Sequence, residues 1–311
     1  MMQAMNMNQQ KKLRGDILRN ETMAKHTSWR TGGVASIFYT PVDLDDLSLF
    51  LSQQSENTQI IFVGLGSNLL VRDAGLDAVV ICTSGVLNKI EARDDYCIYA
   101  ETGVPSPKLA KVSAKQGLSG AEFLCGIPGT VGGALAMNAG AMSGDTWSIV
   151  KNITTIDQHG QIHNRSVSDF DIAYRSVKEK KSSDFKIGKN EWFIGATLQL
   201  QKGSREQSEQ KIKSHLARRG ATQPTQQPNA GSVFRNPIGD YAARLIESVG
   251  LKGYCIGGAC VSEKHANFII NTGTATASDI ESLINHVHQT VENEFKINLI
   301  REVRIIGTKS E

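Results

Sequence analysis

The sequence lacks the features that mark a membrane-bound, secreted or disulfide-bonded chain. No stretch reaches the roughly 18 apolar residues that a membrane-spanning helix needs, and the N-terminus has no apolar signal core. We therefore expect a cytoplasmic protein. The five cysteines are odd in number and form no C-x-x-C pair, which argues against a disulfide framework and a zinc site. We expect reduced, mostly buried thiols and no bound metal.

One-sided charge is also scarce. The chain has 34 Lys and Arg against 31 Asp and Glu, so its net charge is only +3. The basic residues are scattered, unlike those of a nucleic-acid-binding face. With 311 residues, 40% of them apolar, the chain can bury a substantial core in two or three domains. We expect a soluble monomer or weak oligomer that binds no nucleic acid.

A regular alternation of strands and helices is missing too, which favours an α+β fold over a doubly wound sheet. Short apolar runs typical of strands occur between residues 35 and 200. The segment GATQPTQQPNAG, at residues 220–231, has the composition of a connection between domains. Periodicity predicts helices over residues 44–54, 107–116, 206–219, 240–249 and 278–295, and a final strand over 299–306.

Two glycine-rich segments stand out, and V-G-L-G-S-N-L-L at residues 63–70 is the first. Gly64 and Gly66 permit positive φ, so successive N–H groups can bind an anion, with Ser67 and Asn68 as additional donors. Leu69 stands where a dinucleotide-binding fingerprint has its third glycine. An ordinary tight turn explains this segment equally well.

The second segment, G-I-P-G-T-V-G-G-A at residues 126–134, holds more glycine than a turn needs. No G-K-[ST] follows, which disfavours a P-loop nucleotidase. Close contact between a helix and a sheet is the alternative explanation, and it suits some of these glycines but not all of them.

Ser232 lies in the stretch PNAGSVFRNP, directly after a glycine. A nucleophilic serine needs a nearby base, and the G-x-S-x-G pattern of many hydrolases is absent. Taken alone, Ser232 is a hydroxyl that caps a turn. A proton donor is the rarer alternative.

Several motifs, in this order along nearly the whole chain, closely resemble the UDP-N-acetylenolpyruvoylglucosamine reductase family. They are HTSWRTGG (26–33), VGLGSNLL, GLSGAEFLCGIPGTVGGA (117–134), YR (174–175), AGSVFRNP (230–237), GLKG (250–253), IGGACVSEKHANFIIN (256–271) and EVRIIG (302–307). The resemblance implies an α+β fold with an FAD-binding region of the vanillyl-alcohol-oxidase (PCMH) type, made of two lobes. We expect an N-terminal lead-in and helix (1–30), the FAD-binding domain (31–202) and a substrate-binding domain (203–311).

The activity that the resemblance implies has two steps. NADPH gives a hydride to FAD, which then reduces the enolpyruvyl group of UDP-N-acetylenolpyruvoylglucosamine to UDP-N-acetylmuramate, a peptidoglycan precursor. We expect the FAD to be non-covalent, because no histidine or cysteine attachment signature lies beside the glycine segments.

The family's catalytic positions fall on Arg175, Ser232 and Glu302. Hydride addition to the enolpyruvyl group leaves negative charge at its C2 atom and on its carboxylate. Arg175 suits this charge because a guanidinium binds a carboxylate with two bonds. Ser232 then gives C2 a proton and needs no histidine. Glu302 helps only when it is protonated or acts through water, and we expect its pKa to be raised. The alternative explanations are a surface ion pair for Arg175, a turn cap for Ser232 and a solvent-facing carboxylate for Glu302.

The resemblance also assigns ligand contacts. The cofactor-binding residues are Gly64, Gly66, Ser67, Asn68, Leu69, Gly126, Ile127, Pro128, Gly129, Thr130, Gly132, Gly133, Asn138 and Arg219. The substrate-binding residues are Tyr174, Arg235, Asn236 and Lys252.

The short connection from Arg175 to the strand resuming at Phe193 resembles the type II form, which lacks a lid over the substrate. Lys252 is then the best-placed cation for the diphosphate, although an exposed turn lysine is the simpler explanation.

Two rival functions remain. One is another FAD oxidoreductase of the same superfamily, which the substrate-domain motifs AGSVFRNP and EVR disfavour. The other is a nucleotide-binding module without enzymatic activity, which would use only the glycine segments.

Overall fold

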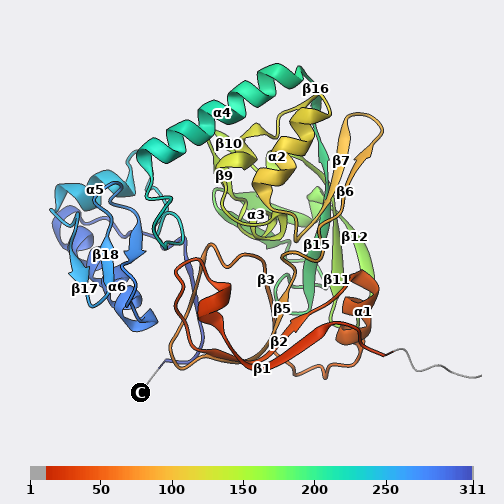
Figure 1. The fold of residues 1–311 in the computed structure, drawn as a ribbon, viewed down its shortest axis with the longest axis horizontal. Helices are drawn as coiled ribbons and strands as arrows, with labels where there is room; N and C mark the ends of the chain where they lie inside the picture. Colours follow the sequence, from red (N-terminus) through yellow and green to blue (C-terminus); the bar gives the residue numbers. More distant parts are fainter. Residues whose placement is uncertain (1–11, 310–311) are drawn as a thin grey trace, which may run out of the picture.

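The computed structural model describes residues 12–309, which form a two-lobed first part and a smaller C-terminal unit (Figure 1). The predicted lead-in, residues 1–11, lies outside the described residues. No helix in the described part of the chain is long and apolar enough to cross a membrane.

The first lobe is built on a four-stranded sheet in the order β1-β2-β5-β3. Its strands are β1 (Asp16–Thr22), β2 (Val34–Thr40), β3 (Ile60–Val63) and β5 (Leu76–Cys82), and helix α1 (Leu44–Ser52) packs beside them. Within residues 12–30, the described part of the predicted lead-in and helix, the chain forms no α-helix, because β1 pairs along its length with β2 and only the short 3-10 helix η1 (Met23–His26) follows. Pairing with a distant strand outweighs local preference at this position.

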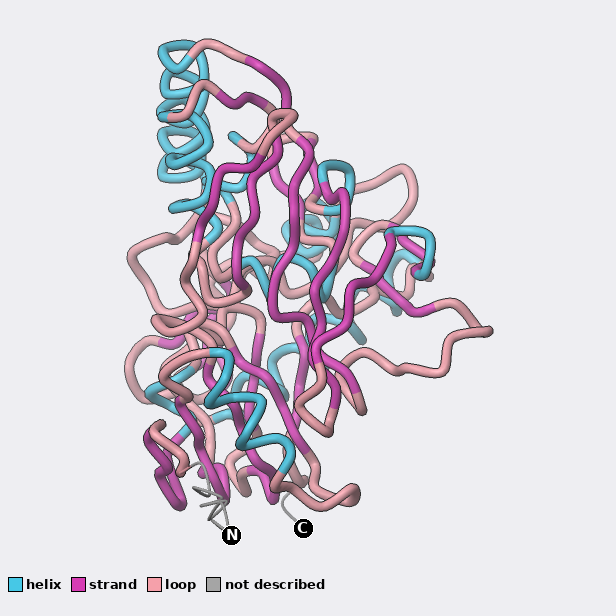
Figure 2. Tube along the Cα trace, turned by 90° about the vertical axis from the view of Figure 1, so that its right-hand side faces the viewer, coloured by secondary structure: helices cyan, strands magenta, loops and turns pink. Residues whose placement is uncertain are grey.

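The second lobe is built on an antiparallel sheet in the order β12-β11-β15-β7-β6. In Figure 2 its strands run side by side across the face turned to the viewer. The central strand, β15, is buried almost throughout, because helices α2 (Ser106–Lys115) and α3 (Val131–Met137) cover one face of the sheet and the first lobe packs against the start of β15. The strands are β6 (Ile90–Arg93), β7 (Cys97–Glu101), β11 (Val150–Asp157), β12 (Ile162–Ser166) and β15 (Glu191–Gln199).

The helices and short elements of this lobe complete its core. The helices are α2 (Ser106–Lys115), η2 (Glu122–Gly126), α3 (Val131–Met137), η3 (Trp147–Ile149) and η4 (Val167–Asp169). Three two-stranded ladders pair β8 (Leu118–Ser119) with β16 (Gln201–Lys202), β9 (Gly140–Ala141) with β10 (Gly144–Asp145), and β13 (Phe170–Ala173) with β14 (Ser176–Glu179).

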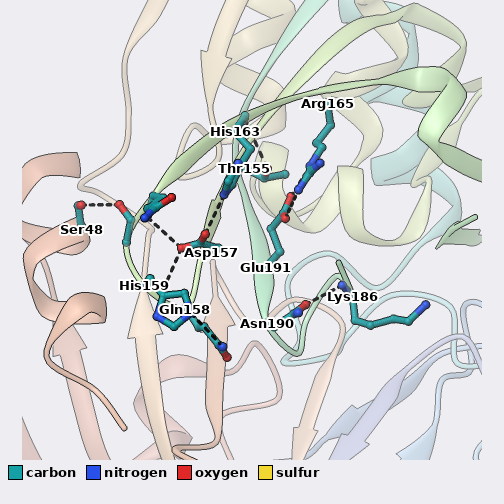
Figure 3. Close-up of polar contacts among 12 residues, drawn as sticks. Ser48, Thr155, Asp157, Gln158, His159, His163, Arg165, Lys186, Asn190 and Glu191 are labelled. Atoms are coloured by element: carbon teal, nitrogen blue, oxygen red, sulfur yellow. Dashed lines mark hydrogen bonds and ion pairs between the residues drawn. The ribbon is translucent and has the colours of Figure 1, made fainter. Parts of the chain in front are cut away.

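Polar contacts join the two lobes at the β11–β12 turn (Figure 3). The hydroxyl of Ser48, on α1, donates to the carbonyl of Gly160 at 2.5 Å. Asp157 braces the same turn, because its carboxylate accepts from the main-chain N–H groups of His159 and Gln161. The lobes are therefore linked by hydrogen bonds as well as by apolar packing.

Helix α4 (Arg205–Thr222) leads from the second lobe toward the C-terminal unit (Figure 1). It packs against α2 and η2, its Ser208 hydroxyl donates to Glu122 at 2.7 Å, and Ile212 belongs to the core of the second lobe. We therefore propose that α4 be counted with the first part and that the C-terminal unit begin near residue 223.

The C-terminal unit packs helices α5 (Ala242–Ser248) and α6 (Ala277–Phe295) with the sheet β17-β18-β19. Its strands are β17 (Cys255–Ile256), β18 (Ala259–Val261) and β19 (Ile269–Asn271). The prediction of five free thiols is wrong, because Cys255 and Cys260 form a disulfide across β17 and β18. The tight turn at Gly257 and Gly258 brings these two residues opposite each other. Cys82, Cys97 and Cys125 are free.

The end of the chain returns to the first lobe. The last strand, β20 (Arg304–Ile306), is shorter than predicted and pairs in parallel with β4 (Leu69–Val71). The preceding residues run beside 233–235 instead, with N–H to carbonyl contacts of 2.8 Å from Glu302 to Val233 and from Arg235 to Ile300. This crossing places the C-terminal unit against the first glycine-rich segment.

Candidate active site

A cavity of about 970 Å³ lies where the two lobes and the C-terminal unit meet. Both glycine-rich segments line it, together with the end of α4, the stretch around Ser232 and the returning chain at Glu302. Its size is near the upper end of the range for small-molecule sites. It can therefore hold a large cofactor and a substrate together.

The two glycine-rich segments pack directly against each other. The Ser67 hydroxyl donates to the carbonyl of Pro128 at 2.7 Å. A Cβ on Gly64 would lie 2.3 Å from the hydroxyl of Thr130, and one on Gly129 would lie 2.6 Å from that of Ser67. These glycines therefore allow the two loops to approach each other closely.

Adjacent glycines at the start of α3 have different surroundings. A Cβ on Gly132 would lie 2.8 Å from the Cβ of Thr102, so Gly132 serves packing. A Cβ on Gly133 would meet nothing within 4 Å, and Gly133 lines the cavity. The absence of a side chain at Gly133 thus widens the space for a ligand.

Ser232 and Glu302 come together through main-chain pairing. The N–H groups of Glu302 and Val303 both point to the carbonyl of Val233, at 2.8 and 3.4 Å. The side-chain amide of Asn68 donates to the carbonyl of Glu302 at 3.1 Å. The first glycine segment, Ser232 and Glu302 therefore line one cavity although they are far apart in sequence.

Arg175 lies in the two-residue turn of the β13–β14 hairpin, with φ of 53°. Few residues other than glycine adopt this backbone conformation, and residues that do so cluster at functional sites. The guanidinium donates to Glu302 at 3.1 Å and to the carbonyls of Asn138 and Gly140 at 3.2 and 2.7 Å. Three of its five N–H groups are thus used, which leaves two for a ligand.

Burial raises the pKa of Glu302 above its ordinary value. The positive charges of Arg175 and Arg235 oppose this shift, but the cost of burying a carboxylate prevails. This direction confirms our expectation for the pKa of Glu302. The cavity therefore favours the protonated carboxyl group.

Three further arginines at the cavity supply positive charge. Arg218 and Arg219 lie near the C-terminal end of α4, and burial lowers the pKa of Arg219. Arg304 lies two residues after Glu302, and its main-chain N–H donates to the carbonyl of Asn68 at 3.0 Å. Our sequence analysis missed Arg218 and Arg304. The strand period of two was the available signal for Arg304, because it puts residues 302 and 304 on one face.

The structure brings most of the predicted site residues to this cavity. They are Gly64, Gly66, Ser67, Asn68, Leu69, Gly126, Ile127, Pro128, Gly129, Thr130, Gly133, Arg175, Arg219, Ser232, Asn236 and Glu302. Tyr241, His265 and Phe268 also line it and were not predicted as site residues, although His265 and Phe268 lie in the motif at residues 256–271.

Five predicted residues lie outside this lining. Gly132 packs on the sheet, as described above. Asn138 and Tyr174 line a second hollow of about 420 Å³ that also borders Arg175. The Nε atom of Arg235 is buried without a hydrogen-bond partner among the described residues. The ammonium group of Lys252 lies 2.9 Å from Glu247.

Asn138 has a clear structural role. It ends α3 in the left-handed conformation, and its side chain accepts from the Trp147 N–H at 3.0 Å and donates to the carbonyl of Ala173 at 3.3 Å. It therefore holds the hairpin that carries Arg175. Within residues 12–309, no group of three or more His, Cys, Asp or Glu side chains is arranged to hold a metal ion.

Two family models match the chain. Residues 35–166 match "FAD binding domain", and residues 223–306 match "UDP-N-acetylenolpyruvoylglucosamine reductase, C-terminal domain". The second match begins where α4 ends.

Whole-chain relatives agree with these matches. UDP-N-acetylenolpyruvoylglucosamine reductase of Methylococcus capsulatus is 50% identical over 94% of both chains. The protein of the same name from Legionella pneumophila is 52% identical over 94% of this chain and 93% of its own. The solved structure of UDP-N-acetylenolpyruvylglucosamine reductase from Thermus caldophilus matches with a TM-score of 0.75 and 28% identity, over 94% of this chain and 98% of its own. With an α+β fold, an FAD-binding domain and full-length relatives at this level of identity, the chain belongs to the UDP-N-acetylenolpyruvoylglucosamine reductase family.

Proposed function

We propose that this protein is a cytoplasmic FAD-dependent reductase that uses NADPH to reduce UDP-N-acetylenolpyruvoylglucosamine to UDP-N-acetylmuramate. One observation carries the proposal. Arg175, Ser232 and Glu302, which come from different elements, meet at one cavity walled by two glycine-rich segments. The proposed activity makes the protein an enzyme of peptidoglycan precursor synthesis.

The residues at the cavity fit FAD. The glycine segments offer main-chain N–H groups, Gly133 leaves open space, and Arg218, Arg219 and Arg304 can offset the pyrophosphate charge. When bound there, FAD would take a hydride from NADPH and supply it to C3 of the enolpyruvyl group. The two lobes position the cofactor and carry Arg175, and the C-terminal unit brings Ser232 and Glu302.

Arg175 would bind the substrate carboxylate. The hydride adds at C3, so negative charge develops at C2 and spreads into that carboxylate. The two N–H groups of Arg175 that no described residue uses can hold the carboxylate in place. The contacts with Asn138 and Gly140 fix the guanidinium before the charge appears.

Ser232 would give the proton to C2. A carbanion is basic enough to take a hydroxyl proton, so no histidine is needed beside Ser232. The raised pKa of Glu302 keeps its carboxyl group protonated over a wider pH range. A neutral Glu302 can donate a hydrogen bond toward the developing charge rather than oppose it.

The diphosphate of the substrate would be held by fixed groups, as in the lidless type II form. After Arg175 the chain continues directly into β14, the loop 180–190 and β15. Asn236 lines the cavity. Burial lowers the pKa of the half-buried His265, which also lines the cavity, and the charge of the nearby Lys252 adds to this shift. We propose that Lys252 exchanges Glu247 for the diphosphate.

The visible spectrum of the purified protein tests the proposal. Under anaerobic conditions, NADPH should bleach a flavin spectrum, and one equivalent of the enolpyruvyl nucleotide should restore it. A spectrum restored only by oxygen, together with oxidation of simple alcohols, would favour another flavin oxidoreductase. A colourless protein that binds no added FAD would favour the nucleotide-binding module.

A pair of helix glycines tests where FAD binds. Gly133→Leu fills the open space at the cavity and should weaken FAD binding at least tenfold, a loss of about 1.4 kcal/mol. Gly220→Leu on α4 is the matched control, because a Cβ on Gly220 also meets nothing within 4 Å but this residue does not line the cavity. Equal weakening in both variants contradicts the assignment. Acid precipitation should leave the yellow colour in the supernatant, as non-covalent binding requires.

A further inference from the structure

The Cys255–Cys260 pair lies outside the cavity and has no part in the proposed chemistry. Its sulfur atoms are bonded, and the two residues are direct partners in the β17–β18 ladder. Cys255 is exposed and Cys260 is half-buried. The strand pairing holds the two side chains opposite each other whether or not they are bonded.

The three other cysteines differ in surroundings. Cys97 and Cys125 are buried, and all three are free. Burial raises the pKa of Cys82, which disfavours the reactive thiolate. Among the described cysteines, the pair in the hairpin therefore combines an exposed sulfur with a partner in reach.

The two strands of the hairpin continue into the Lys252 turn and the loop 262–268, and main-chain hydrogen bonds hold the base of the hairpin together. The N–H of Gly253 donates to the carbonyl of Val261 at 3.0 Å, and the N–H of Val261 donates to the carbonyl of Tyr254 at 2.9 Å. After β18, the chain enters the loop 262–268, which brings His265 and Phe268 to the cavity. The turn that carries Lys252 and this loop are thus the two continuations of one hairpin.

We propose that Cys255 and Cys260 form a redox-modification site that alternates between dithiol and disulfide by exchange with low-molecular-weight disulfides, and that its state tunes substrate affinity. The second half of this proposal rests on the proposed function. Lasting disulfides are rare in the cytoplasm, where those that occur are usually transient or redox-sensing. The bridge closes only a short loop, so it contributes less stability than a long-range bridge does.

The exchange balances in two steps. The thiolate of exposed Cys255 attacks one sulfur of the small disulfide, forming a mixed disulfide and releasing one small thiol. Cys260 then attacks the Cys255 sulfur, forms the internal bond and releases the second small thiol. Two protein thiols are oxidised while one small disulfide is reduced to two thiols, and the protons of the protein thiols pass to the departing thiolates.

The structure also gives the expected direction of the effect. In the disulfide form, the bond adds to the ladder that holds the Lys252 turn and the loop 262–268 in place. Reduction leaves only the hydrogen bonds, so the substrate side is less preorganised. We expect the KM for the UDP substrate to be about threefold higher in the dithiol form, with kcat within a factor of two.

Thiol mapping tests the modification without any assay of turnover. The full-length protein is equilibrated with glutathione buffers of different thiol-to-disulfide ratio, quenched with acid, alkylated and digested for mass spectrometry. We expect the 255–260 peptide to change from linked to doubly alkylated as reduced glutathione increases, and to change back on reversal. A pair that stays alkylated in excess glutathione disulfide overturns the proposal, and so does a bond that survives a large excess of reduced glutathione.

Kinetics test the coupling. The double variant Cys255→Ser, Cys260→Ser should show the higher KM in every buffer, whereas the control Cys82→Ser should keep the redox-dependent KM. A KM that does not change while the peptide is seen to switch overturns the coupling. If neither redox form of the wild-type protein turns over the substrate, the proposed function fails. The redox site would still stand or fall by the thiol mapping, which does not depend on turnover.

Discussion

Two arginine–glutamate pairs in this chain have the same chemistry and opposite surroundings. Arg165 binds Glu191 through two hydrogen bonds, of 2.8 and 2.6 Å, at the β12 and β15 strands (Figure 3). Arg175 binds Glu302 through a single hydrogen bond of 3.1 Å at the edge of the cavity. Both carboxylate oxygens of Glu191 accept from Arg165, so we call the first pair complete, whereas only one oxygen of Glu302 accepts from Arg175, so we call the second pair incomplete.

The surroundings reinforce this difference. The Arg165 guanidinium also lies 4.0 Å from the centre of the Phe185 ring, and the hydrogen bond that it donates to Glu191 raises the pKa of Arg165. Arg175 has positive φ and lines the cavity, while burial raises the pKa of its partner Glu302. A two-bond ion pair away from the cavity stabilises the fold, whereas an incomplete pair with a shifted pKa at a cavity indicates a ligand site.

Removal of the proposed proton donor, Ser232, should have the largest effect. We expect Ser232→Ala to slow flavin reoxidation by the enolpyruvyl substrate by about 10² to 10⁴. Flavin reduction by NADPH should stay nearly unchanged, because that step needs no proton from Ser232. Anaerobic stopped-flow absorbance measures the two half-reactions separately, and equal slowing of both would indicate damage to the fold instead.

A substitution in the complete pair, Arg165 and Glu191, should lower the stability of the fold. Arg165→Lys replaces the two-bond contact with a single point charge beside a carboxylate that is only 2% exposed. We expect the free energy of unfolding to fall by about 1–3 kcal/mol. Chemical denaturation measures this change, and Arg205→Lys, whose partner is the exposed Glu209, is the surface control that should lose almost nothing.

Lys252 tests a contact at the edge of the cavity. We expect Lys252→Ala to raise the KM for the UDP substrate about tenfold, equivalent to about 1.4 kcal/mol, with a smaller change in kcat. The diphosphate is remote from the reacting carbons, so the loss falls mainly on binding. Glu247→Ala is the matched control, because it frees Lys252 and should not raise KM. An unchanged KM in Lys252→Ala would show that this lysine does not bind the diphosphate.

The smallest effect concerns pH. The folded protein holds the Glu302 proton more tightly than the unfolded chain does, so wild-type stability falls as pH rises from the ordinary value of 4.5 through the raised pKa. Glu302→Gln stays neutral and should therefore have a higher unfolding midpoint than wild type at pH 8 and the same midpoint near pH 4. Glu191→Gln should be less stable at pH 8, because it weakens a complete pair. Thermal unfolding at the two pH values decides, and a less stable Glu302→Gln at pH 8 would contradict the account.

Sequence patterns predicted the elements whose signals are local. Helix α6 follows a capping box between Thr276 and Asp279, and its apolar positions recur with the helical period. The strand predicted over 299–306 was too long, because one apolar run pairs with two different segments. The hairpin that joins Cys255 to Cys260 was missed although two glycines flanked by apolar residues indicate such a turn.

The site was predictable where motifs exist and unpredictable where only folding brings residues together. Ser232 and Glu302 are carried by AGSVFRNP and EVR, and His265 lies in IGGACVSEKHANFIIN, whereas Tyr241 lies in no motif and reaches the cavity through the packing of the C-terminal unit. The positive φ of Arg175 has no signal in the sequence, because it depends on the hairpin that Asn138 holds.

Single-turnover reoxidation in Arg175→Lys and Arg165→Lys tests the central contrast most directly. Both proteins are reduced with NADPH without oxygen and mixed with the enolpyruvyl nucleotide at a temperature at which circular dichroism shows each to be folded. A lysine at 175 cannot hold the carboxylate with two bonds, so we expect reoxidation to slow by about 10² or more, whereas Arg165→Lys should stay within about threefold of wild type. Equal rates in the two variants would contradict the assignment of Arg175 and Glu302 to the reaction and of Arg165 and Glu191 to the fold.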